Sequence, residues 1–180
     1  MIIWLNGPFG VGKSTTTALL LAGDPSLLSF DPETIGHLLQ PVLNERRPVS
    51  DFQDWPAWRS LTVQTLIALH EELAMDLVVP QTVVVREYWD DIAAGLVARG
   101  LPLLGLTLDV APDEHDRRIA HDAAEPGAAG WRRARRADYD GAKAWLSAAT
   151  IMVDTTSSSP SDVVAVIRAA IAAARSDQSR

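Results

Sequence analysis

Short, continuous apolar runs alternate along this chain with longer segments whose apolar residues recur at helical spacing. Continuous apolar runs are typical of strands that are covered on both faces. The expected strands are Met1–Asn6, Leu77–Pro80 and Leu103–Val110, with weaker candidates at Leu27–Phe30 and Thr150–Val153. The expected helices are Phe52–Met75, Tyr88–Arg99, Asp113–Asp122 and Val163–Arg175. This alternation predicts right-handed crossovers and a three-layer α/β fold, with a central parallel sheet of about five strands.

Two segments do not fit the alternating pattern. Pro41–Ser50 is polar and contains two prolines, so we expect a loop there. Ala123–Gly130 is rich in alanine and glycine and is followed by the basic run WRRARR. We interpret this second segment as the entrance to a lid of about residues 123–140, embedded in a single domain that spans residues 1–180.

Composition and charge exclude several classes of function. The chain has no cysteine, which removes disulfides, thiolate nucleophiles and cysteine-bound metals. Its formal charge of −7 argues against a nucleic-acid partner. The opening MIIWLNGPFG lacks a basic leader, and no apolar stretch is long enough to span a bilayer. We therefore expect a cytoplasmic protein without integral membrane association.

The run GPFGVGKS at residues 7–14 has the pattern of a phosphate-binding loop, G-x-x-x-x-G-K-[ST]. It lies where that pattern requires, between an apolar strand and a predicted helix. Glycines let consecutive backbone N–H groups converge on phosphate oxygens at the positive end of the helix. Lys13 would neutralise the β- and γ-phosphates, and the Ser14 hydroxyl would complete a Mg²⁺ shell. The predicted nucleotide-binding residues here are Gly7, Pro8, Phe9, Gly10, Val11, Gly12, Lys13, Ser14 and Thr15.

Asp31 follows the second expected strand, at the sheet edge where the phosphate loop also lies. A carboxylate there can accept the proton of an acceptor hydroxyl or hold a Mg²⁺-bound water. The alternative is a helix N-cap with Pro32 at the first helical position, and one residue can do both. Asp109 and Asp154 are rival acids at strand ends, but the strand Leu77–Pro80 ends without an acid. We therefore predict that Asp31 is the catalytic carboxylate.

Six arginines gather after the fourth expected strand, where cationic groups could stabilise a transferring phosphoryl group. They are Arg117, Arg118, Arg132, Arg133, Arg135 and Arg136. The alternative is a solvated basic helix face with Asp138 and Asp140 as partners. We expect one or two of the six to contact phosphate, and we assign Arg118 a catalytic and nucleotide-binding role. The four histidines show no metal-ligand spacing, so we expect surface or capping roles for them.

Several blocks of the sequence together resemble the tunicamycin-resistance protein (TmrB-like) family. These blocks are MIIWLNGPFGVGKST, FDPETIG, DFQDWPAWR, VVPQT and EYW, and the similarity runs from Met1 to about Arg118. The resemblance implies a P-loop NTPase fold like that of nucleoside monophosphate kinases, with an ATP site and a neighbouring acceptor groove. The family is associated with resistance to the nucleoside antibiotic tunicamycin. It therefore implies ATP- and Mg²⁺-dependent phosphorylation of a hydroxyl on such a small molecule.

The same resemblance places the acceptor between the helices after the second strand and the end of the third strand. The residues that it implies are Asp31, Glu33, Asp51, Phe52, Gln53, Arg59, Gln81 and Thr82. For Arg59 a surface ion pair is the alternative. Asp154 and Thr155, after the last strand, are candidates for the adenine edge. Two other functions stay open: a housekeeping nucleoside or small-metabolite kinase, and an ATP-dependent protein that sequesters the antibiotic without modifying it.

Overall fold

The computed structural model of the chain describes residues 1–121, 130 and 134–178. Within these residues, five parallel strands form one sheet in the order β2-β3-β1-β4-β5. The strands are β1 (Ile2–Asn6), β2 (Leu27–Ser29), β3 (Asp76–Pro80), β4 (Leu103–Asp109) and β5 (Ile151–Asp154). All five lie where the apolar runs predict them, within one or two residues at each end.

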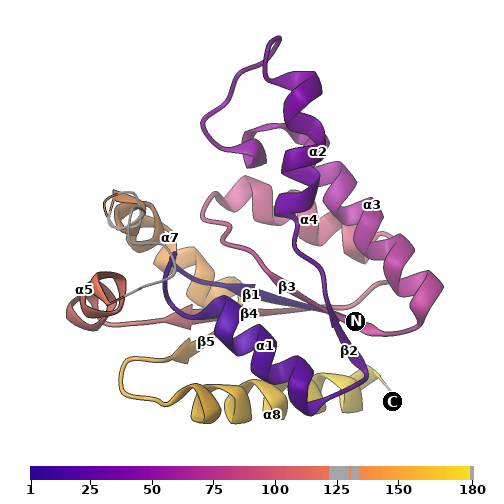
Figure 1. Cartoon of the computed structure of the whole chain (residues 1–180). Coiled ribbons are helices and arrows are strands. Elements are labelled where there is room, and N and C mark those ends of the chain that lie inside the picture. The colour runs from indigo at the N-terminus through magenta and orange to yellow at the C-terminus, as the bar shows by residue number, and fades with distance from the viewer. Residues whose placement is uncertain (122–129, 131–133, 179–180) are drawn as a thin grey trace.

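Helices cover both faces of the sheet, which confirms the three-layer α/β fold (Figure 1). One face carries α1 (Lys13–Gly23) and α8 (Pro160–Gln178), and the other carries α3 (Pro56–Leu73), α4 (Arg86–Val97) and α7 (Arg136–Ala149). Two further helices, α2 (Glu33–Leu43) and α5 (Pro112–Ala120), follow the carboxyl ends of β2 and β4. These two ends are where the sequence places the candidate chemistry.

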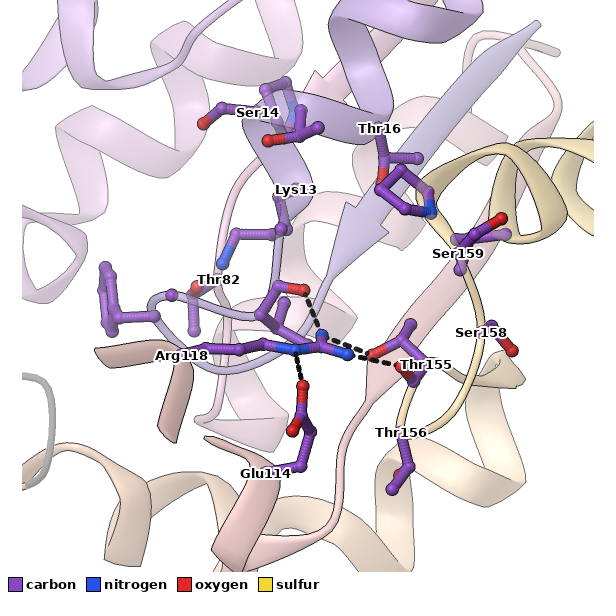
Figure 2. A pocket seen from close by; sticks show the side chains of 18 of the residues that line it. Lys13, Ser14, Thr16, Thr82, Glu114, Arg118, Thr155, Thr156, Ser158 and Ser159 are labelled. Atoms are coloured by element: carbon purple, nitrogen blue, oxygen red, sulfur yellow. Dashed lines mark hydrogen bonds and ion pairs between the residues drawn. The ribbon is translucent and has the colours of Figure 1, made fainter. Parts of the chain in front are cut away.

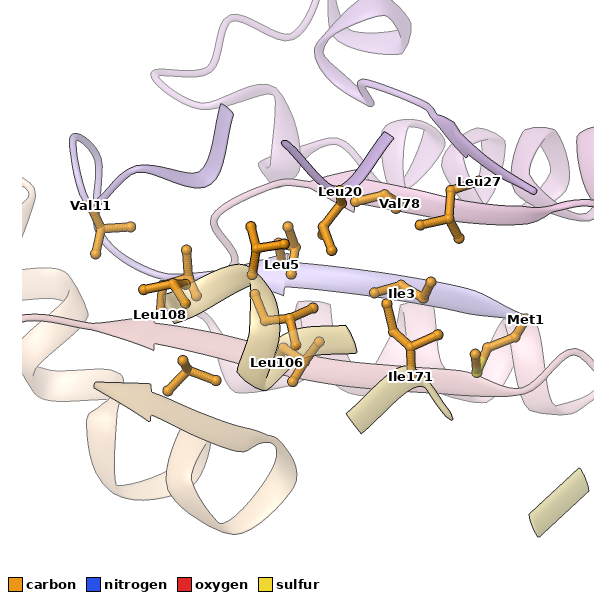
Figure 3. Close-up of a cluster of buried hydrophobic side chains, with 14 of the residues drawn as sticks. Met1, Ile3, Leu5, Val11, Leu20, Leu27, Val78, Leu106, Leu108 and Ile171 are labelled. Carbon is orange, nitrogen blue, oxygen red and sulfur yellow. The ribbon is translucent and has the colours of Figure 1, made fainter. Parts of the chain in front are cut away.

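The central strand β1 shows why its apolar run is uninterrupted. Side chains alternate along a strand, so Ile3 and Leu5 pack under α1 and α8, while Ile2 and Trp4 pack under α3 and α4. All four side chains have no exposed surface. Figure 3 shows the first of these clusters, with Leu20 of α1 and Ile171 of α8 closing over the strands. Each such side chain contributes roughly 1.5–3 kcal/mol by leaving water, so both layers are held to the same strand.

The prediction of a loop over Pro41–Ser50 is wrong at its start, because α2 continues through Pro41 to Leu43. Proline lacks an N–H, so only the hydrogen bond to the carbonyl four residues back is lost, in the last turn of the helix. The next bond is present, since the Asn44 N–H donates to the Gln40 carbonyl at 3.0 Å. Leu39 and Leu43 pack against the core and offset the loss.

The expected helix over Phe52–Met75 is instead a 3₁₀ turn, η1 (Phe52–Asp54), followed by α3. Trp55 has the extended conformation that a residue before proline favours, so the helix begins anew at Pro56. Most of the predicted lid, with Arg132 and Arg133, lies outside the described residues, while residues 136–140 form the first turns of α7. Across residues 1–121 and 134–178, no helix has the length and apolarity needed to cross a membrane.

Candidate active site

The loop between β1 and α1 has the backbone conformation of a phosphate-binding loop. Its three glycines all have positive φ: 135° at Gly7, 86° at Gly10 and 110° at Gly12. At Gly7 space is limiting as well, because a Cβ there would lie 2.4 Å from the carbonyl oxygen of Leu108. Glycine is therefore required at this position by both conformation and contact.

Replacing Gly7 with alanine is expected to lower the free energy of unfolding by about 3 kcal/mol, since it adds backbone strain to an overlap with β4. Urea unfolding of the two proteins measures this difference. Gly141→Ala is the matched control, because an added Cβ in α7 meets no atom within 4 Å. That variant should be neutral or slightly more stable. Equal stabilities for Gly7→Ala and wild type would contradict the steric argument.

Hydrogen bonds from neighbouring strand ends hold the start of the loop. The Thr82 hydroxyl donates to the Gly7 carbonyl at 2.8 Å. The Asn6 side-chain oxygen accepts from the N–H groups of Gly7 and Val83 at 2.8 and 3.0 Å. Lys13 reaches back over the loop, and its Nζ donates to the carbonyls of Gly7 and Pro8, both at 3.0 Å. The ammonium thus already lies within the loop.

The loop forms one wall of a cleft of about 1210 Å³ at the carboxyl edge of the sheet (Figure 2). The second wall is the end of β3 with Gln81 and Thr82, and Asp31 and Glu33 lie beside it. α5 and the β5–α8 connection complete the cleft. The residues that these two contribute are Glu114, Arg117, Arg118, Thr155, Thr156, Ser157, Ser158 and Ser159, and the start of α8 adds Pro160 and Val163.

Asp31 lies at the start of α2 and lines the cleft. Its Oδ1 accepts a hydrogen bond from the Glu33 N–H at 2.9 Å at the start of α2. Its side chain is exposed to solvent and lines the cleft. The carboxylate is therefore both a helix cap and accessible to a substrate. Its catalytic role stays a prediction.

Arg118 connects three parts of the site (Figure 2). Its Nε donates to Glu114 at 2.7 Å, and its Nη1 donates to the Val11 carbonyl and the Thr155 hydroxyl at 3.2 and 3.0 Å. Nη2 donates to the Thr155 carbonyl at 2.5 Å. Arg117 also pairs with Glu114, at 2.6 Å, and hydrogen bonds from Arg117 and Arg118 lower the pKa of this carboxyl to about 2. In this arrangement Arg118 joins the loop to β5, and its predicted contact with phosphate remains a prediction.

The two described arginines that follow the predicted lid entrance do not line the cleft. Arg135 pairs with Asp138 at 3.2 Å, and Arg136 pairs with Asp140 at 2.8 Å. Asp138 and Asp140 are the partners expected if these arginines form a solvated basic helix face and do not bind phosphate. Arg136 also donates to the Val110 carbonyl at 3.1 Å, so it fastens the start of α7 to the end of β4.

The expectation of a surface or capping role is wrong for His115. Its side chain is 1% exposed, and its Nε2 lies 2.7 Å from the carbonyl oxygen of Phe9. Burial lowers the pKa of this imidazole, and the positive charge of Arg136 lowers it further. A neutral histidine therefore contacts the outer side of the phosphate loop.

Apart from Gly7 and Pro8, five predicted substrate or nucleotide residues lie outside the cleft lining: Asp51, Phe52, Gln53, Arg59 and Asp154. The Asp51 carboxylate accepts a hydrogen bond from the Gln53 N–H at 2.9 Å. Gln53 is buried, and its side-chain amide donates to the Thr82 carbonyl at 2.8 Å. Phe52 packs against Trp58. Arg59 pairs with Asp91 at 2.9 Å, which is the ion pair expected as the alternative to substrate binding. The Asp154 carboxylate accepts from the Thr156 N–H at 2.9 Å, at the turn that leaves β5.

The predicted residues that do line the cleft are Phe9, Gly10, Val11, Gly12, Lys13, Ser14, Thr15, Asp31, Glu33, Gln81, Thr82, Arg118 and Thr155. Gly7 and Pro8 belong to the loop but lie behind this surface. Glu114 and the hydroxyl-rich run Thr156–Ser159 also line the cleft, and neither was predicted from the sequence. A detectable signal for that run was its position, directly after the last strand and before an apolar helix.

The chemistry of the cleft fits a nucleoside triphosphate with Mg²⁺. Gly10 and Gly12 bring left-handed backbone to the cleft surface, a conformation in which successive N–H groups can converge on an anion. Ser14 offers a hydroxyl at the start of α1. Among the described residues, no group of three or more histidines or acids could hold a metal by itself. Mg²⁺ commonly takes its other ligands from phosphates and water, so one hydroxyl is a sufficient protein contribution.

No family model and no curated protein sequence matches this chain significantly. Solved structures do. The tunicamycin resistance protein of Deinococcus radiodurans superposes with a TM-score of 0.73 at 28% identity, over 94% of each chain. A gluconokinase from Sinorhizobium meliloti gives 0.62 at 18% identity, over 98% of this chain and 94% of its own. Shikimate kinase from Aquifex aeolicus gives 0.54 at 18% identity, over 97% of this chain and 98% of its own.

The last two similarities concern the fold, and both proteins are small-molecule kinases by name. The first extends to sequence and confirms the resemblance to tunicamycin-resistance proteins on which the site was predicted. The chain therefore has the fold of the P-loop kinases and is similar, over nearly its whole length, to a tunicamycin resistance protein.

Proposed function

We propose that this protein transfers the terminal phosphoryl group of ATP to a hydroxyl of a small molecule, and that this molecule is tunicamycin or a closely similar nucleoside. One observation carries the proposal. A single cleft brings the phosphate loop, with Lys13, together with the accessible carboxylate of Asp31. A phosphate cradle beside a proton acceptor is the minimal arrangement for phosphoryl transfer to an alcohol.

The phosphate loop would hold the nucleotide through backbone N–H groups and the Lys13 ammonium, and the Ser14 hydroxyl would ligate Mg²⁺. ATP with its Mg²⁺ supplies the phosphoryl group and neutralises part of its charge. Thr155 and Thr156 line the part of the cleft formed by the β5–α8 connection, where we expect the base to lie. Lys13 acts mainly as a compact positive charge, which suits a site where charge builds up on phosphate oxygens.

Asp31 would accept the proton of the acceptor hydroxyl as its oxygen bonds to phosphorus. The exposed position of this carboxylate supports the role, because an acceptor can approach it from solvent. Glu33 and Gln81 line the same part of the cleft and offer further polar contacts for a hydroxyl-bearing molecule. Orientation by these groups makes the attack effectively intramolecular.

The choice of tunicamycin is supported by the similarity to the Deinococcus radiodurans protein, which is named for resistance to this antibiotic. The likeness covers 94% of both chains. Its identity of 28% is enough to support the same acceptor as a proposal to be tested.

Mass spectrometry of tunicamycin, incubated with the protein, ATP and Mg²⁺, tests this function. We expect a mass gain of one phosphate that requires ATP. Unchanged tunicamycin together with intact ATP would overturn the proposal for this acceptor. If tunicamycin binds but remains unmodified, the protein is a sequestering one. ADP formation with simple nucleosides or sugar acids in place of tunicamycin would instead identify a housekeeping kinase.

A further inference from the structure

Helix α5 holds the outer side of the phosphate loop with two side chains. His115 Nε2 lies 2.7 Å from the Phe9 carbonyl oxygen, and Arg118 Nη1 lies 3.2 Å from the Val11 carbonyl oxygen. The two residues are three positions apart and therefore share one face of the helix. A carbonyl oxygen can only accept, so the His115 Nε2 carries the proton.

These contacts fix the direction of the N–H groups that follow. In a trans peptide, the carbonyl of one residue and the N–H of the next point in opposite directions. When His115 holds the Phe9 carbonyl, it orients the Gly10 N–H away from α5. Arg118 does the same for Gly12 through Val11. Gly10 and Gly12 both line the cleft.

His115 also differs from Lys13 in what happens when an anion binds. The Lys13 ammonium now donates to the loop carbonyls of Gly7 and Pro8, and these bonds compete with any bond to phosphate. His115 approaches from buried surroundings and does not line the cleft. Its hydrogen bond can therefore persist while Lys13 turns to a phosphate.

The charges around His115 favour a neutral imidazole. Burial lowers its pKa, as do the positive charges of Arg136 on α7 and Lys13 on α1. The hydrogen bond to the Phe9 carbonyl and the charge of Asp116 on α5 raise the pKa, but the net direction is down. A neutral donor can orient the loop without changing the net charge next to the phosphate site.

We propose that His115 is a positioning residue of the nucleotide site, which keeps the phosphate loop in its anion-binding conformation through the Phe9 carbonyl. The inference rests on the proposed function insofar as that loop binds ATP. His115 lies on α5, outside the P-loop motif. It has no direct part in the proposed phosphoryl transfer.

ATP titration by calorimetry of the full chain, at neutral pH with Mg²⁺, tests the role in three variants. His115→Leu removes the donor and should weaken ATP binding about tenfold, which is the equivalent of one hydrogen bond. His115→Gln keeps an N–H near the place of Nε2 and should restore the affinity to within about threefold of wild type. In steady-state assays, His115→Leu should raise the KM for ATP and leave the KM for the acceptor unchanged.

His70→Leu is the matched control. His70 makes the same kind of bond, from Nδ1 to the Met75 carbonyl at 2.7 Å, at the end of α3. Both leucine variants lose one bond to a backbone carbonyl, so both should lose thermal stability, but only His115→Leu should lose ATP affinity. If His115→Leu does not fold, His115→Asn replaces it, because its shorter side chain cannot reach Phe9.

Three results would overturn the inference. The first is equal ATP affinity of wild type and His115→Leu, and the second is failure of His115→Gln to restore what His115→Leu loses. The third is a wild-type protein that does not bind ATP, which would also overturn the proposed function. The first two results leave that function standing, so the two failures are distinguishable.

Discussion

Lys13→Ala is expected to lower the rate of phosphoryl transfer about 1,000-fold and to weaken ATP binding. The ammonium is the positive charge that the P-loop pattern places against the β- and γ-phosphates, and in the structure it lies 3.0 Å from two carbonyl oxygens of the loop itself. Removing it leaves the backbone N–H groups of the loop as the main phosphate ligands. ATP-dependent formation of product, followed at saturating acceptor, measures the loss of rate.

Lys143→Ala is the matched control, since Lys143 is the other lysine of this sequence. Its ammonium pairs with Asp109 at 2.6 Å, is half exposed, and lies outside the cleft. Both substitutions remove one positive charge, so an effect of net charge would appear in both. Transfer should be unchanged in Lys143→Ala. A wild-type rate in Lys13→Ala would contradict the assignment of the loop as the phosphate site.

The strands and the phosphate loop could be predicted because their causes are local. A strand covered on both faces needs apolar residues at successive positions, and β1 has them from Ile2 to Leu5. The loop needs positive φ at fixed positions, and glycine marks all three of them. The same holds for Asp31, whose capping bond to Glu33 spans only two residues.

The partners of Gln53 and Arg59 could not be predicted, because they are distant in sequence. Gln53 is itself a predicted substrate residue, yet its amide bonds to the carbonyl of Thr82, 29 positions further along the chain. Arg59 pairs with Asp91, 32 positions away, and its guanidinium lies 4.2 Å from the centre of the Tyr88 ring. The packing of α3 against α4 brings Arg59 to Asp91 and Tyr88, whereas Gln53 reaches Thr82 from the turn η1, and no short motif encodes either contact.

The position of His115 was partly predictable from the sequence. The segment Pro112–Ala120 is strongly polar, so a buried side chain there is unexpected. However, His115 and Ile119 are four positions apart on one helix face, and both are buried. The sequence therefore contained a signal for its burial, but the bond to Phe9, 106 positions away, depends on the tertiary fold.

Asp31→Asn is expected to lower the rate of transfer about 1,000-fold while leaving ATP affinity and thermal stability close to those of wild type. The asparagine side-chain oxygen can still accept the Glu33 N–H that Asp31 now accepts at 2.9 Å, so the start of α2 is preserved. What is lost is the negative charge that would take the hydroxyl proton. Steady-state rates, ATP titration and thermal unfolding of the same preparation separate these effects.

Asp24→Asn is the matched control for this substitution. Asp24 also accepts an N–H two residues on, that of Ser26 at 2.9 Å, but it lies outside the cleft. It also pairs with Arg175 at 3.4 Å, so this control should lose some stability and no activity. If Asp31→Asn has the wild-type rate and Glu33→Gln is inactive, Glu33 is the base. Cells protected from tunicamycin equally by Asp31→Asn and wild type would instead favour sequestration, because binding alone needs no proton acceptor.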